Sequence, residues 1–177
     1  MSKYEEICKS YADARRAFRD YQTTCRDFAR DLIYGMIDYF EWPQDQEITY
    51  IPLGEEISPN DRFYAIAGAM RMDDHAFWHF GVELTVRESA TSGHPTTILM
   101  SFFIKKTGSH FIVKLGGNGR EIKIHENRKN DLDPFFDAVF KQIVDFFKRG
   151  YIDAVTNQGS DLAFIKLSGK SATNAAS

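Results

Sequence analysis

The sequence predicts an α+β protein, and three observations support this prediction. Over the first forty residues, apolar side chains recur at alternating steps of three and four, the spacing of one helix face. Between Arg62 and Glu126 the period changes to two, as in strands with one buried side. A second helical pattern runs from Pro134 to Arg149. We therefore expect a long N-terminal helix, a five- to six-stranded antiparallel meander, and a C-terminal helix packed on its apolar face.

Composition limits the classes of protein to consider. The chain has 177 residues, 43 % of them hydrophobic, which is enough to build one domain over residues 1–167 without disulfides or metals. A net charge of −3 with both signs mixed disfavours nucleic acid and anionic membranes as partners. The sequence contains neither a secretory signal nor an apolar run long enough to cross a membrane, so a cytoplasmic location is expected.

The first helix is predicted over residues 3–41, and Trp42-Pro43 ends it. If this helix were straight it would be about 58 Å long, which exceeds the diameter of a compact domain of this size. Two alternatives follow: the helix breaks near Thr23 and packs on its own sheet, or it projects and needs a partner. Its apolar side chains form a single seam: Tyr4, Ile7, Tyr11, Ala14, Phe18, Tyr21, Cys25, Phe28 and Leu32.

The sheet is predicted over residues 47–126, with short links that favour antiparallel neighbours. Its expected strands are Glu47–Leu53 at an edge, Arg62–Arg71, Ala76–Glu88, Thr97–Lys106, Phe111–Leu115 and Arg120–Glu126. Alternation along these strands gives one apolar face: Ala76, Trp78, Phe80, Val82, Leu84, Val86, Ile98, Met100, Phe102, Ile104, Phe111, Val113, Leu115, Ile122 and Ile124. His79, Glu83, Thr85 and Arg87 fall on the opposite, polar face. Gly116-Gly117-Asn118-Gly119 is expected to be a hairpin turn.

The C-terminal helix is predicted over residues 134–149, with Asp133 as N-cap, Pro134 in the first helical position and Gly150 after the last. Apolar residues cover more than half of its circumference, which indicates burial on more than one side. Residues 161–167 suit a short strand or an extended arm. Residues 168–177 are small and polar and are expected to form a disordered tail.

No motif in the sequence commits the chain to a chemistry. His75 and His79 are four residues apart, but on a strand that spacing separates them by roughly 13 Å, too far for one shared metal ion. A metal site would need His110 or His125 from neighbouring strands, and we predict neither a metal nor a cofactor. The enzyme question stays open, with a non-enzymatic function favoured.

Glu121-Ile122-Lys123 places a carboxylate and a lysine on one side of a strand. With the helix and short strand that follow, this order resembles the end of a PD-(D/E)xK nuclease core. The resemblance implies a metal-dependent nuclease in which Glu121 helps to hold the metal and Lys123 helps to position a water. The strands from Thr97 to Leu115 contain no Asp or Glu that would supply the second carboxylate.

The polar face of the sheet suggests a second kind of site. It combines cationic, hydroxyl and aromatic groups, and a cleft between a sheet and a helix is a common place for a small ligand. The candidate ligand-cleft residues are Thr85, Arg87, Ser101, Phe103, Lys105, Lys114, Lys123 and His125. The alternative is an ordinary solvated face.

The function favoured by the sequence is protein binding through the N-terminal helix, as an adaptor-type protein that forms a homodimer or binds another protein. The helical seam is too long to be buried within one small domain, and aromatic residues often dominate the binding energy of interfaces. The predicted interface residues are Tyr4, Ile7, Tyr11, Phe18, Tyr21 and Phe28.

Overall fold

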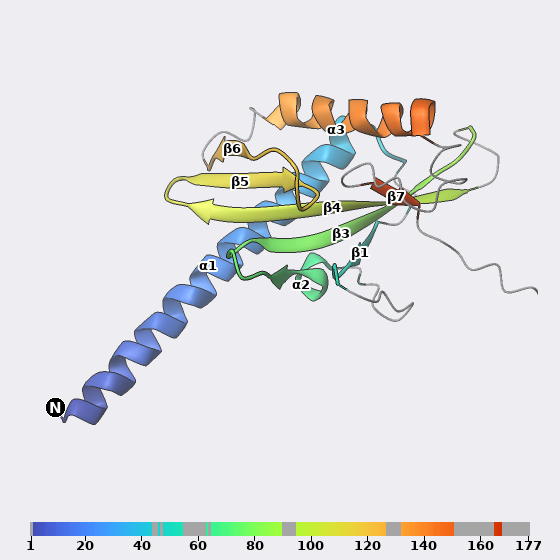
Figure 1. Ribbon diagram of the computed structural model, residues 1–177. Coiled ribbons are helices and arrows are strands. Elements are labelled where there is room, and N and C mark those ends of the chain that lie inside the picture. Colours follow the sequence, from blue (N-terminus) through green and yellow to red (C-terminus); the bar gives the residue numbers. More distant parts are fainter. Residues whose placement is uncertain are drawn as a thin grey trace, which may run out of the picture.

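The computed structural model describes residues 2–43, 46, 48–54, 63, 65–89, 95–126, 132–150 and 165–167. Within these residues an antiparallel sheet packs its apolar face against two helices, and the N-terminal helix extends well past the sheet (Figure 1). This arrangement confirms the predicted α+β fold. The predicted tail, 168–177, lies outside the described residues. Among those described, no helix combines the length and apolar character needed to cross a membrane.

Helix α1 runs without interruption from Lys3 to Tyr39, 37 residues or about 55 Å. Ser2 caps it: its hydroxyl accepts from the Glu5 N–H, and the Glu5 carboxylate accepts from the Ser2 N–H. The helix ends two residues earlier than predicted, and Glu41 has a positive φ of 50°. Of the two alternatives left open by the sequence, the continuous helix is the one observed.

The helix continues through the expected break near Thr23. The Thr24 hydroxyl donates to the Asp20 carbonyl, 2.8 Å away, a side-chain bond that helical threonines commonly make. The helix contacts the rest of the fold on both sides of Thr23 and Thr24: the Tyr21 hydroxyl donates to the Ala76 carbonyl before them, and Cys25, Ala29 and Leu32 are buried after them. Tertiary contacts therefore hold the helix across the two threonines, which explains why it does not break there.

Seven described strands form the sheet, in the order β1-β3-β4-β5-β6, with β2 beside β3 and β7 beside β4. All pairs are antiparallel, and β3 to β6 form the predicted meander. The strands are β1 (Thr49–Ile51), β2 (Arg71–Met72), β3 (Trp78–Val86), β4 (Thr96–Thr107), β5 (His110–Leu115), β6 (Ile122–His125) and β7 (Ile165–Leu167). Gly116 has a φ of 74° in the predicted turn between β5 and β6, a conformation that suits glycine.

The predicted strand over Arg62–Arg71 is wrong. The described part of this range contains the short helix α2 (Ile66–Ala69), and only Arg71 belongs to a strand, β2. The Phe63 ring packs against Gly68, where an added Cβ would lie 2.4 Å from it. Alternating small and apolar residues suggested a strand. Closely spaced alanines also favour a helix, and the contact of Phe63 with Gly68 packs against this helical turn.

Helix α3 (Asp133–Asp145) continues into a single π-helical turn, Phe146–Gly150. Leu132 occupies the N-cap position in place of the predicted Asp133, which is the first helical residue. The helix lies beside α1, because a Cβ on Gly35 would come within 3.2 Å of the Phe136 ring. The predicted placement of the C-terminal helix on the apolar face is thus confirmed.

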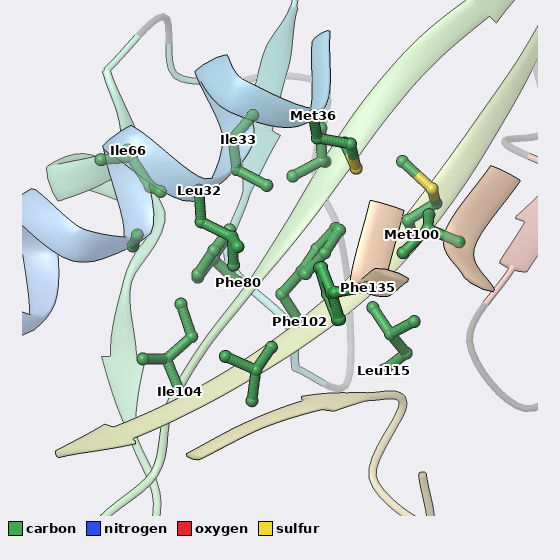
Figure 2. Close-up of a cluster of buried hydrophobic side chains, with 14 of the residues drawn as sticks. Leu32, Ile33, Met36, Ile66, Phe80, Met100, Phe102, Ile104, Leu115 and Phe135 are labelled. Atoms are coloured by element: carbon green, nitrogen blue, oxygen red, sulfur yellow. The ribbon is translucent and has the colours of Figure 1, made fainter. Parts of the chain in front are cut away.

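The core lies between the sheet and these helices. Figure 2 shows side chains from α1, α3 and the central strands pointing toward one another around Phe80 and Phe102, whose rings stack 5.6 Å apart. Most predicted inward positions are buried, although Ala76 lies in the turn before β3 and has a positive φ of 61°. The apolar alternation along β3 to β6 therefore places the core correctly.

Phe102→Ala should lower the free energy of unfolding by about 3–5 kcal/mol, because it removes a fully buried ring from the centre of the core. Phe140→Ala is the matched control, since that ring is 52 % exposed, and it should cost less than about 1 kcal/mol. Urea denaturation measures both values. Equal losses for the two variants would contradict the core assignment.

Candidate functional site

The seam of α1 divides into a buried root and a projecting part. Phe28 stacks on Phe111 of β5 with ring centroids 3.7 Å apart, and the Tyr21 hydroxyl donates to the Ala76 carbonyl at 3.4 Å. Of the predicted interface residues, these two therefore contact the protein's own sheet. Phe18 marks the boundary: its ring lies 6.3 Å from Trp78 and is 46 % exposed.

The projecting part, residues 3–20, is about 27 Å long, and apart from the contact of Phe18 with Trp78 its outer turns have no other described element beside them in Figure 1. Its seam side chains are exposed: Tyr4 by 74 %, Ile7 by 66 % and Tyr11 by 63 %. We call Tyr4, Ile7, Tyr11, Ala14 and Phe18 the exposed seam. Large apolar side chains scattered singly on a surface are ordinary, but here they form one continuous row.

Local interactions keep the projecting part helical. Beyond the Ser2 capping box, Asp13 and Arg16 are 3.6 Å apart one turn along the helix, and the Arg15 guanidinium lies 5.8 Å from the Tyr11 ring centroid. These contacts are solvent-exposed, so each contributes a few tenths of a kcal/mol. The buried half of α1 already provides the helix nucleus, so these weak contacts only have to sustain its extension.

The candidate ligand-cleft residues share the polar face, but that face is closely packed. Lys114 Nζ lies 4.2 Å from the Phe77 ring centroid and bonds the Gly117 carbonyl at 3.2 Å. Lys105 Nζ lies 5.5 Å from the same ring and bonds the His75 carbonyl at 2.9 Å. The register places Phe103 directly opposite Lys114. Lysine stems and rings thus cover the middle of this face.

The remaining cleft residues are spread along the sheet. Thr85 lies at the far end of β3 and Arg87 follows that strand, Ser101 faces Gly81, and Lys123 is exposed on strand β6. Glu83, expected on the solvated face, is only 6 % exposed. Its neighbourhood is covered because Leu53 and Leu99 pack over Gly81. The polar face is therefore partly buried at its β1 end, and its candidate residues do not converge on one cavity.

The histidines and the Glu121–Lys123 motif do not assemble a metal site in the described part of the chain, where no three His, Cys, Asp or Glu side chains are grouped for a metal ion. His110 and His125 face each other across β5 and β6 with ring centroids 4.9 Å apart. Glu121 and Lys123 line a pocket of about 510 Å³ beside Ala138 and Gln142 of α3.

Another pocket, which the sequence did not reveal, lies between α1, β6 and α3. It has a volume of about 320 Å³, an apolar wall that includes Phe28 and Phe136, and carboxylates from Asp31, Asp38 and Glu126. The Glu126 carboxylate bonds Lys106 Nζ at 2.8 Å, which lowers the pKa of that carboxyl. The three elements are far apart in sequence, so periodicity within each of them could not indicate this pocket.

Comparison of the chain with models of known protein families, with curated proteins and with solved structures gave no match. The function has to be inferred from the residues of this chain alone. Its most distinctive surface is the exposed seam of α1.

The two cysteines should differ sharply in reactivity. Cys8 is exposed on the projecting part of α1, whereas Cys25 is fully buried and burial raises the pKa of its thiol. Maleimide labelling at low protein concentration should modify one thiol per chain rapidly. Cys8→Ser should abolish this fast reaction and Cys25→Ser should preserve it. Equal rates for both thiols would contradict the burial of Cys25.

His79 should titrate below its ordinary value. Burial lowers its pKa, and the charge of Arg71 acts in the same direction, while Asp73 opposes them. The unfolded chain then binds more protons below about pH 6.5, so stability should fall as the pH drops through and below that value. NMR titration of the His79 ring measures the pKa. A midpoint at or above 6.5 would contradict this environment.

Proposed function

We propose that this protein is a non-enzymatic protein-interaction protein, and that it forms a homodimer through the projecting part of α1. The observation that carries the proposal is the continuous seam whose root is buried on the protein's own sheet and whose outer part is exposed. The projecting part makes up about 27 Å of the 37-residue helix. The aromatic character of the exposed seam suits a binding surface.

The size of the exposed seam supports a second copy of the chain as the partner. Aromatic side chains bury about 150–250 Å² each, so covering the exposed fractions of the seam in two copies would bury roughly 1,000 Å² in total. A specific interface needs about that area. Two identical seams can provide it by packing against each other, because heptad spacing lets the side chains of two helices interlock.

The residues that flank the seam also support self-association. In heptad terms the positions beside it are Lys3, Ser10 and Ala17 on one side and Cys8 and Arg15 on the other. Cys8, Ser10 and Ala17 are small and uncharged. Lys3 and Arg15 lie on opposite sides, so two helices can approach along the seam. Most charged residues of the projecting part lie away from the seam, where they stay hydrated.

The proposed compartment is a reducing cytoplasm. Both cysteines are free thiols, and Cys8 is exposed on the surface of α1. An exposed free thiol persists more readily where glutathione and thioredoxin keep cysteines reduced.

Tyr11→Asp should dissociate the dimer without unfolding the protein, because Tyr11 is central in the exposed seam and its side chain is largely exposed in the single chain. The change should raise the dimer dissociation constant at least ~30-fold, the effect of losing a hot-spot residue worth about 2 kcal/mol. Ala12→Asp introduces the same charge on the face of the helix that points away from the seam and should leave the dimer intact. Sedimentation equilibrium measures association, and circular dichroism checks folding.

Two outcomes would contradict the proposal. One is a wild-type protein that stays monomeric throughout the micromolar range. The other is an equal rise of the dimer dissociation constant in Tyr11→Asp and Ala12→Asp. That result would show that added charge anywhere on the helix weakens the dimer and that the seam is not the contact surface. Phe28→Asp provides a contrast, since it breaks the stack on Phe111 and should unfold the body.

A further inference from the structure

The root of α1 limits how a second helix can lie on the exposed seam. The protein's own sheet already covers the seam from Tyr21 onward, with Cys25 and Leu32 fully buried beneath the helix. Trp78 lies against Phe18 just before that point. Only the stretch from Tyr4 to about Phe18 is open to a partner. This inference rests on the proposed homodimer and concerns its geometry.

A parallel pair conflicts with this arrangement. In a parallel pair the second helix would continue along the seam past Phe18, into the space that β3 and β5 of the first copy occupy. The sheet of the second copy would meet the first helix in the same way. An antiparallel pair avoids both clashes, because each body then lies at an opposite end of the helix pair.

The length of the open stretch selects one register. If Tyr4 of one copy faced Tyr21 of the other, its helix tip would meet the body beside Ala76. Moving the partner helix by one heptad toward the tip makes Tyr4 face Ala14. The partner helix then ends level with Arg16, just outside the body. A further heptad shift would leave only Tyr4 and Ile7 in contact. The middle register therefore gives the longest overlap without a clash.

Side-chain sizes fit this register. Tyr4 of each copy faces Ala14 of the other, and Ile7 faces Tyr11, so a large side chain meets a smaller one in every layer. The two-fold axis passes between the helices at the level of residue 9, where Lys9 lies on the outer face, and Ser10 lies near Ser10 of the second copy on one flank. Neither flank brings two charges of the same sign together near this axis.

The helix dipoles favour the same orientation, because they are opposed in an antiparallel pair. The charged side chains do not decide it. The tip carries Lys3 as well as Glu5, and the root carries Asp13 as well as Arg15, so both ends are of mixed charge.

We infer that two copies of this chain pair antiparallel along the exposed seams of α1, with Tyr4 of one copy packed on Ala14 of the other. The two bodies then lie at opposite ends of the helix pair.

Disulfide formation tests the orientation in a Cys8→Ser background, where the remaining Cys25 is buried. Tyr4→Cys and Ala14→Cys chains of different mass are mixed, re-equilibrated and oxidised. A disulfide needs Cα atoms within about 7 Å, so the mixed dimer should cross-link and each variant alone should not.

Tyr4→Cys cross-linking to itself would indicate a parallel pair. Preferential cross-linking of Ala14→Cys with Tyr11→Cys would indicate the slipped register. Either result overturns the inference.

A second measurement leaves the seam intact. Spin labels on Arg19→Cys, in the same background, lie on the outer face near the root. Antiparallel pairing in the inferred register separates the two labels by about 30 Å along the helix axis, whereas parallel pairing leaves them at the same level. Pulsed electron paramagnetic resonance should therefore report a distance of about 30 Å or more between the two spin labels. A distance near 15 Å would overturn the antiparallel orientation.

Sedimentation separates the two failures. If the Cys8→Ser parent is a monomer at the concentrations used for cross-linking, the proposed homodimer itself fails. If the parent and the cysteine variants are dimers and the mixed pair still does not cross-link, the homodimer stands and the antiparallel register fails.

Discussion

Packing of the C-terminal half of α1 on the apolar face of the sheet is the contact on which the rest of the structure depends. Leu32, Ile33 and Met36 complete a core to which α3 and the central strands also contribute (Figure 2). This anchor makes continuation of the helix toward the N-terminus inexpensive, because elongating an existing helix avoids the cost of nucleation. The projecting part is therefore helical before any partner binds, and its seam is already formed.

A preformed seam differs from a segment that folds on binding. Little backbone entropy remains to be lost when a partner docks, so a modest interface of roughly 1,000 Å² can suffice. The same rigidity restricts the geometry of the complex. Since Phe18 already lies against Trp78, a partner can approach only from the tip side. The body of the protein thus acts as a steric stop that would set the orientation and register of a helix pair.

Several features could be predicted because they depend on neighbours in the chain. The apolar alternation of β3 to β6, the Gly116 turn and the start of α3 are local patterns, and the structure contains all three. Local reasoning failed where two patterns were both compatible with the residues, as in Arg62–Arg71, where α2 forms instead of a strand. It also failed for Glu83, which is buried on a part of the polar face where Leu99 of β4 lies opposite it and Leu53 packs over the neighbouring Gly81.

The sequence by itself determined the seam of α1, because heptad spacing is a property of a single helix. It could not decide whether the seam was buried or exposed, since that depends on how far along the helix the sheet reaches. Tertiary structure decided this: the packing of Phe28 on Phe111 and of Tyr21 beside Ala76 fixes where the body ends. Contacts between residues so distant in the chain are set by the packing of whole elements, so the candidate interface was defined only when the helix and sheet were seen together.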